Sequence, residues 1–190
     1  VPGWTGSKGS ATDYTDEDYY WTLGKCLEIG PVVEKHMAIM DKYDPKKRVG
    51  LMVDEWGTWW DEEPGTIKGH LYQQNTMRDA MVAALSLNIF HRVKMTNIAQ
   101  IANVLQAMVL TKDDQMVLTP TYYVFKMYVP HQDATYIPLD IDTPARKVRD
   151  NRFVPVISAT ASEKDGKVTI SLTNTDLAEN FDINIPLESL

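Results

Sequence analysis

A short apolar run that ends in two acids and three tryptophans constrains the fold more than any other part of the chain. The run begins at Val49, and its last apolar residue, Val53, is followed directly by Asp54 and Glu55. Helical patterns lie on either side, and an apolar run in that setting predicts a β-strand buried on both faces, as in a parallel sheet. Because burial of an unpaired carboxylate is strongly unfavourable, the two acids have a role other than packing.

The position of these acids at the end of a strand suggests chemistry. In barrels of alternating strands and helices, catalytic groups lie at the carboxyl ends of the strands. Asp54 and Glu55 are adjacent, so on a strand their side chains point to opposite sides. We expect one of them to face a site and the other to be held by backbone groups or basic neighbours.

The segments around this strand alternate between helix and strand. Gly30-Pro31 breaks the first helical segment, and Asp44-Pro45 ends it. Asn97 or Gln100 lies near the end of a second strand. We predict helices over residues 16–43, 72–90 and 120–128, a loop over 61–69, and the second strand in the first half of 93–104. This order is that of an α/β fold with a parallel sheet.

The pattern changes after His131 to the two-residue period of half-buried strands. Residues 168–172 and 181–185 alternate between apolar and polar side chains, and Asp165-Gly166 indicates a hairpin turn before the first of them. An α/β part over residues 1–131 is therefore followed by an all-β part over 132–190. Two strand–helix units do not close a barrel, so the chain resembles the C-terminal slice of a longer polypeptide.

Composition excludes several classes of function. The net charge of -7 and the pI of about 5.0 argue against a nucleic-acid binder. No stretch approaches the roughly 20 apolar residues that span a bilayer. Cys26 is the single cysteine, and the histidines lack metal-ligand spacing, so we expect no disulfide, metal or cofactor. The chain starts at Val1 without a visible signal peptide, which suggests a start partway along a longer protein in a cytoplasmic, periplasmic or secreted location.

The residues at the end of the first strand suit glycoside hydrolysis. That reaction uses two carboxylates, about 5 Å apart when configuration is retained. Glu55 can serve as one of them, with the tryptophans stacking on sugar faces. The alternative is a buried Asp54/Glu55 pair that anchors loops beside tryptophans in the core. No partner acid is evident, because Glu62 and Glu63 lie on a loop where a solvated face is expected.

Several motifs in a fixed order then point to a known family. They are Gly9-Ser10-Ala11-Thr12-Asp13, Val53-Asp54-Glu55-Trp56-Gly57-Thr58-Trp59-Trp60, Glu63-Pro64-Gly65-Thr66, Leu71-Tyr72-Gln73-Gln74-Asn75-Thr76-Met77-Arg78-Asp79-Ala80, Asn97-Ile98-Ala99-Gln100, Asn103-Val104-Leu105-Gln106-Ala107 and Leu118-Thr119-Pro120-Thr121-Tyr122. Together they resemble the α-L-arabinofuranosidases of glycoside hydrolase family 51. The resemblance implies a (β/α)8 barrel followed by a β-sandwich, with residues 1–131 forming the last part of the barrel and 132–190 part of the sandwich.

The resemblance also implies roles for individual residues. Glu55 corresponds to the retaining nucleophile, Gln100 to a residue that hydrogen-bonds the furanose, and Trp59 to an aromatic on the leaving-group side. Asp54 is then a supporting residue. The family's acid/base glutamate lies in an Asn-Glu motif on an earlier strand, and this sequence contains no such motif. We therefore expect a polypeptide of these 190 residues alone to be inactive.

The leading hypothesis is an exo-acting enzyme that removes terminal α-L-arabinofuranosyl groups from arabinan or arabinoxylan. The full-length protein is expected to form homo-oligomers, as family members often do. A first alternative is another retaining glycosidase on the same barrel, such as an endoglucanase or a xylosidase. A second is a non-catalytic carbohydrate-binding module with Trp56, Trp59 and Trp60 as a stacking platform.

Overall fold

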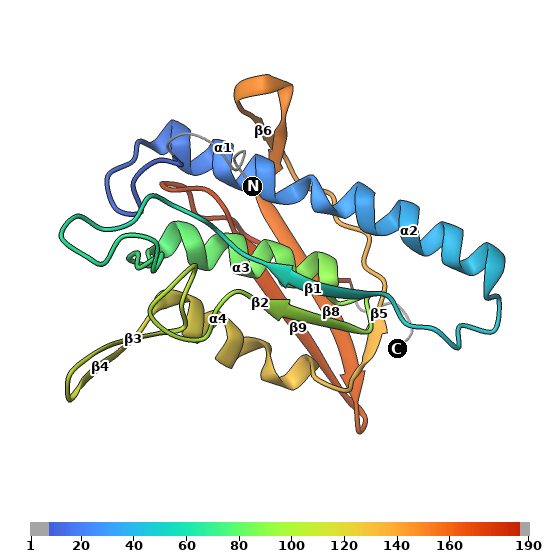
Figure 1. Ribbon diagram of the computed structural model, residues 1–190. Coiled ribbons are helices and arrows are strands. Elements are labelled where there is room, and N and C mark those ends of the chain that lie inside the picture. Colours follow the sequence, from blue (N-terminus) through green and yellow to red (C-terminus); the bar gives the residue numbers. More distant parts are fainter. Residues whose placement is uncertain (1–7, 187–190) are drawn as a thin grey trace.

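A computed structural model describes residues 8–186 and contains four α-helices in that range. The helices are α1 (Asp16–Leu27), α2 (Ile29–Tyr43), α3 (Met77–Phe90) and α4 (Pro120–Tyr128), with short 3-10 turns η1 (Val129–His131) and η2 (Arg149–Asn151). Figure 1 shows α1 and α2 running nearly end to end above α3, with α4 below it. Among the described residues, no helix combines the length and the apolar character needed to cross a membrane.

The strands form one parallel pair and several antiparallel groups. The parallel pair is β1 (Met52–Trp56) with β2 (Met95–Ile98). The antiparallel groups are the hairpin β3 (Val109–Lys112) with β4 (Gln115–Leu118), the sheet β5 (Thr135–Ile137), β8 (Ile157–Lys164) and β9 (Lys167–Asn174), and the ribbon β6 (Ala145–Lys147) with β7 (Phe153–Pro155). Parallel pairing comes first along the chain, and antiparallel pairing follows from β3–β4 onward. The described residues after His131 contain strands and the turn η2 but no α-helix, as the change of pattern predicts (Figure 1).

Capping residues set most helix ends where the sequence predicts them. Thr15 caps α1, and Thr119 caps α4 by accepting a hydrogen bond from the backbone N–H of Tyr122. The break between α1 and α2 falls at Glu28, so Pro31 lies in the first turn of α2, where its missing N–H is tolerated. The predicted start of the third helix at residue 72 is wrong, because α3 begins at Met77 with Thr76 as its N-cap.

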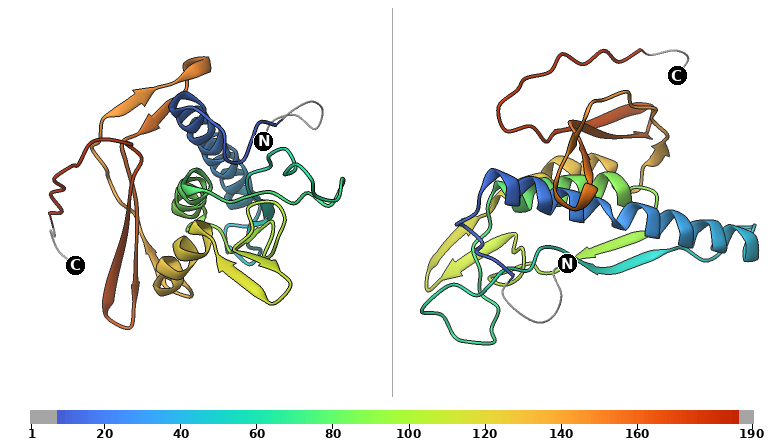
Figure 2. Two further views of the ribbon diagram at one scale, coloured as in Figure 1. Left: turned by 90° about the vertical axis from the view of Figure 1, so that its left-hand side faces the viewer. Right: turned by 90° about the horizontal axis from the view of Figure 1, so that it is seen from above.

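The prediction that the first strand is buried on both faces is wrong for this chain. Met52, Asp54 and Glu55 are exposed, and Val53 and Trp56 are partly buried. Within the described residues β1 pairs on one edge only, with β2, so its other edge and much of its surface stay open (Figure 2). An apolar run predicts the strand correctly but does not show which neighbours cover it.

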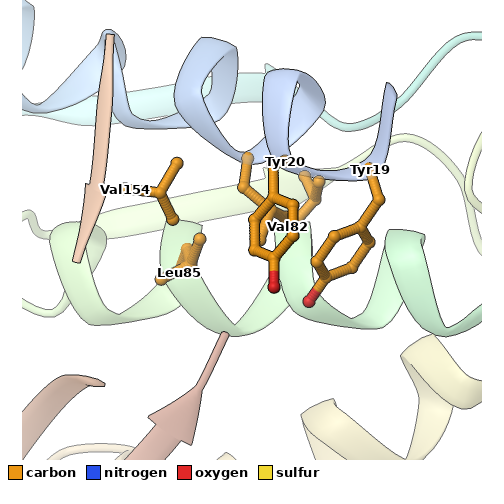
Figure 3. Packing of buried hydrophobic residues seen from close by; sticks show 6 residues of the cluster. Tyr19, Tyr20, Val82, Leu85 and Val154 are labelled. Atoms are coloured by element: carbon orange, nitrogen blue, oxygen red, sulfur yellow. The ribbon is translucent and has the colours of Figure 1, made fainter. Parts of the chain in front are cut away.

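The larger core cluster joins both parts of the chain. Tyr19, Tyr20 and Leu23 of α1 pack against Val82 and Leu85 of α3 and against Val154 of β7. Figure 3 shows Val154 directed at the side chains from the two helices. The core therefore crosses the expected boundary after residue 131, and the division into 1–131 and 132–190 stays a prediction about domain architecture.

The C-terminal part contains one predicted hairpin and lacks one predicted strand. The turn at Asp165-Gly166, with φ of 55° and 75°, joins β8 to β9 as expected. Residues 181–185 form no strand and are exposed, so that prediction is wrong. Alternation alone does not make a strand, because a strand needs a partner for its backbone groups. The hairpin β3–β4 has no counterpart among the predicted elements.

Candidate active site

The two parallel strands bring the predicted site residues to one edge of the sheet. Trp56 of β1 pairs with Ile98 of β2, and the carbonyl of Trp56 accepts a hydrogen bond from Ala99 N–H at 2.9 Å. Glu55 and Gln100 therefore lie at neighbouring carboxyl ends, and both are exposed. This edge is where sheets of alternating strands and helices place binding and catalytic groups.

The strand pairing is irregular at the two acids. Val53 pairs with Thr96 and Trp56 with Ile98, so Asp54 and Glu55 together face a single residue of β2. Bulges with two residues facing one are rare in parallel pairs, and bulges in general are over-represented beside active sites, where the extra residue redirects side chains. Both acids are exposed, so within the described chain they form no buried Asp54/Glu55 pair.

The residue after Trp56, Gly57, has a positive φ. Its φ is +148°, and a Cβ atom there would lie 2.9 Å from the carbonyl oxygen of Ala99. Thr58 and Trp60 are then buried, while Trp59 between them is partly exposed. These residues belong to the four-residue loop Gly57–Trp60, here called the post-strand loop. Along it, buried and partly exposed side chains alternate beyond the end of β1.

Three buried polar side chains hold the post-strand loop. The Oδ1 atom of Asp79, on the first turn of α3, accepts the Thr58 hydroxyl at 2.5 Å and the Trp60 indole N–H at 2.8 Å. The amide oxygen of Gln106 accepts the backbone N–H of Thr58 at 2.7 Å, and that of Gln73 accepts the backbone N–H of Trp60 at 2.6 Å. All three anchoring residues are at most 1% exposed.

Arg78 connects this network to the segment before α1. Its guanidinium lies 3.8 Å from the ring centroid of Tyr14 and 3.6 Å from that of Trp60, within cation–π range of both. It also donates to the carbonyl oxygens of Ser10 and Ala11. Burial lowers the pKa of Arg78 from its ordinary value. The contacts fix residues 10–14 against the post-strand loop.

The tryptophans do not form the flat stacking platform that a binding module requires. Trp60 is 5% exposed, and Trp56 packs in the core against Phe90 and Phe125. Trp59 is partly exposed, with the Lys8 ammonium 5.0 Å from its ring. A cavity of about 60 Å³ lies between the post-strand loop and α1. Trp59 is thus the one of these three that the described chain presents for contact with a ligand.

The remaining polar candidates have structural partners. Glu62 accepts the backbone N–H groups of Gly69 and Leu71, and Glu63 accepts that of Gln74. These bonds hold the loop together, so the expectation of a solvated acidic face is wrong. No group of three His, Cys, Asp or Glu side chains within residues 8–186 is arranged to hold a metal ion. Burial raises the pKa of the Cys26 thiol to about 11, so it stays protonated near neutral pH.

The three anchoring residues are not among the site residues predicted from the sequence. Asp79 has a local signal, since Thr76 and Asp79 have the spacing of a helix capping box. Gln73 and Gln106 have none, because each binds backbone groups far away in the sequence. All three residues lie within the motifs that carry the family resemblance, but the resemblance assigns none of them a role.

Comparison with known proteins agrees with this arrangement. A family model described as the α-L-arabinofuranosidase C-terminal domain matches residues 54–187. An intracellular exo-α-L-arabinofuranosidase from Bacteroides ovatus is 66% identical over 192 residues, covering 98% of this chain and 37% of that protein. The crystal structure of a family 51 arabinofuranosidase from Xanthomonas axonopodis pv. citri aligns with a TM-score of 0.86 at 50% identity, over 93% of this chain and 36% of that one. An arabinofuranosidase from Thermotoga maritima, 21% identical with a TM-score of 0.65 over 85% of this chain and 36% of that one, shares the fold.

These matches, together with a carboxylate at the end of a parallel strand, place the chain among the glycoside hydrolases. It belongs to the α-L-arabinofuranosidases of glycoside hydrolase family 51, within the C-terminal region of those enzymes. The chain spans 37% of the length of its Bacteroides relative and 36% of the Xanthomonas enzyme.

Proposed function

We propose that the full-length protein is an exo-acting α-L-arabinofuranosidase and that Glu55 is its nucleophile. The observation that supports this most directly is the exposed Glu55 on a bulge at the carboxyl end of β1, beside the end of β2 that carries Gln100. The relative from Bacteroides ovatus carries the activity in its name.

The proposed reaction retains configuration. The Glu55 carboxylate attacks the anomeric carbon, the bond to the leaving-group oxygen breaks, and an acid outside these 190 residues protonates that oxygen. Water then attacks the arabinofuranosyl–enzyme ester, giving its proton to the same acid, now a base, and releasing Glu55. In this scheme Gln100 hydrogen-bonds the furanose, Trp59 lines the leaving-group side, and Asp54 supports Glu55.

The proposed architecture follows from the family. The units β1–α3 and β2–α4 correspond to the last two units of a (β/α)8 barrel, and the antiparallel strands from β5 onward to part of a β-sandwich. The open edge of β1 is where a preceding barrel strand would pair, which fits its exposure here. We further propose arabinan- or arabinoxylan-type glycans as substrates and a homo-oligomer as the full-length form.

The test is covalent labelling of the full-length protein with a mechanism-based arabinofuranosyl inactivator, followed by mass spectrometry and peptide mapping. We expect one label on Glu55, no turnover by Glu55→Gln, and normal turnover by the control Glu34→Gln, an exposed acid on α2. A polypeptide of the 190 residues alone should take no label, because it lacks both the acid and most of the barrel that would form the sugar-binding site.

Other outcomes would select the alternatives. Turnover of xylosides or glucans with a label on Glu55 would indicate another retaining glycosidase. Binding of glycans that survives Glu55→Gln, with no turnover in any form, would indicate a binding module. A label on a different residue would contradict the role given to Glu55.

A further inference from the structure

Asp79 is a fully buried carboxylate for which the proposed reaction has no direct use. It is 0% exposed, and its two oxygens accept four hydrogen bonds. Two donors belong to the post-strand loop, and the other two are the backbone N–H and hydroxyl of Thr76 at the start of α3. The helix cap accounts for one oxygen, whereas the other is used entirely by residues that follow Glu55.

The anchored residues alternate with the residues that carry chemistry. Thr58 is held through its hydroxyl, its backbone N–H and its carbonyl, and Trp60 through its indole and its backbone N–H. Glu55 precedes these anchors on the bulge, and Trp59 lies between them. Fixing Thr58 and Trp60 constrains the backbone that carries Glu55 just before them and Trp59 between them.

The backbone of Asp79 also takes part in the network. The backbone carbonyl of Asp79 accepts the amide N–H of Gln106 at 2.6 Å, and Gln106 in turn accepts from Thr58. One residue thus joins α3, the segment after β2 and the post-strand loop. A neutral amide cannot replace it, since one carbonyl oxygen and one NH2 group would face donors on both sides. Buried networks of this kind act as units when one member is removed.

We infer that Asp79 is a positioning residue for the reaction proposed above: acting through Thr58 and Trp60, it fixes the direction of Glu55 and Trp59 at the end of β1. The inference rests on the proposed function. It differs from a purely structural role because loss of the anchor slows the step at Glu55 in molecules that remain folded.

The test uses the full-length protein and removes one hydroxyl. Thr58→Val deletes the 2.5 Å bond to Asp79 at nearly constant volume, while Thr58→Ser keeps the hydroxyl. We measure the rate constant for labelling of Glu55 by the arabinofuranosyl inactivator, and kcat and KM on an aryl arabinofuranoside, per folded molecule. We expect Thr58→Val to lower the labelling rate constant and kcat/KM by about tenfold or more, because small misplacements of a reacting group have large kinetic effects. Thr58→Ser should stay within about twofold of wild type, and the final stoichiometry of one label should not change.

The matched control is Thr160→Val on β8. Thr160 is 1% exposed and its hydroxyl bonds His91 at 2.6 Å, so this variant also removes one buried hydrogen bond. It should lose comparable stability and keep the wild-type rate constant. If Thr58→Val does not fold, Trp60→Phe removes the other donor to the same oxygen and should slow labelling in the same way.

The outcomes distinguish failure of the positioning role from failure of the proposed function. Labelling of Thr58→Val at the wild-type rate, or equal slowing by Thr160→Val, would overturn the positioning role while Glu55 stays the nucleophile. A wild-type protein that takes no label and shows no arabinofuranosidase turnover would contradict the proposed function, and the inference would fall with it.

Discussion

At Gly57 both the backbone and its surroundings exclude a side chain. The positive φ of +148° is unfavourable for other residues, and the carbonyl oxygen of Ala99 occupies the space a Cβ atom would need. Gly65 offers a comparison, because its φ of +80° is also positive but nothing lies within 4 Å of its Cβ position. Glycine thus lets the chain leave β1 close against the segment that follows β2.

We expect Gly57→Ala to lower the free energy of unfolding of the full-length protein by more than the roughly 1–3 kcal/mol that an unfavourable backbone angle costs alone. Gly65→Ala should show only the backbone effect. The measurement is urea denaturation of both variants beside wild type. Equal losses in the two variants would mean that the contact with Ala99 contributes nothing.

The sequence predicts individual residues well where the signal is local. The placement of Glu55 and Gln100 at adjoining strand ends follows from two apolar runs and their polar ends, and the parallel register confirms it. The burial of Asp79 and Gln106 depends on contacts between distant segments, which no local pattern encodes. The roles of Glu55, Gln100, Trp59 and Asp54 stay predictions until labelling is done.

Among the helices, α1 has the most complete N-terminal cap. The Thr15 hydroxyl accepts the backbone N–H of Asp18 at 3.2 Å, and the Asp18 carboxylate accepts the backbone N–H of Thr15 at 3.1 Å. The Thr15 hydroxyl also donates to the Asp18 carboxylate at 2.8 Å, and this bond, followed by the one from the Thr15 backbone N–H, is the main reason that the pKa of Asp18 lies below its ordinary value. The cap stabilises the N-terminal turn of α1, which is followed by the buried residues Tyr19, Tyr20 and Leu23.

We expect Thr15→Ala to destabilise α1 locally by about 1 kcal/mol, the usual effect of losing an N-cap. Hydrogen–deuterium exchange of the peptide covering Asp16–Leu27 in the full-length protein should become several-fold faster. The control is Thr12→Ala, which changes an exposed threonine outside the helix. Equal exchange rates in wild type and Thr15→Ala would show that packing alone holds this end.

Helices whose ends are marked by capping residues or prolines are predicted correctly. Strand predictions fail where a turn signal or a pairing partner is missing. Thr119-Pro120 and Asp44-Pro45 mark helix ends that the structure confirms. The hairpin β3–β4 turns at Asp113-Asp114 without a glycine and exposes most of its side chains, so it lacks both turn and alternation signals. Residues 181–185 have the alternation but no pairing strand within the described chain.

At the scale of the whole molecule, the partly buried His91 and the buried His131 link the helical part to the C-terminal sheet. His91, at the end of α3, contacts Thr160 of β8 at 2.6 Å, and the ring nitrogens of His131 each lie 2.8 Å from a serine hydroxyl, those of Ser162 and Ser171. The two rings are 4.8 Å apart. Burial, and then the charge of His131, lower the pKa of His91 to about 4.

This arrangement predicts loss of stability in acid. The unfolded chain has a histidine pKa of about 6.5, so between pH 6.5 and pH 4 the unfolded state binds more protons than the folded state. The free energy of unfolding should therefore be highest above pH 6.5 and fall as the pH falls toward 4. We expect urea midpoints of His91→Gln to vary less with pH in this window than those of wild type. The exposed His36→Gln on α2 should retain the wild-type slope. Parallel slopes for wild type and His91→Gln would contradict the assignment.

The core shared by α1, α3 and β7 also has a consequence for synthesis of the protein. Tyr20, Leu85 and Val154 pack together, yet the ribosome makes them in that order. Translation at about 5–20 residues per second leaves the α1–α3 surface uncovered for several seconds before β7 emerges. During that interval the nascent chain shows an apolar face that the finished protein hides, and this is the form on which a ribosome-associated chaperone would act.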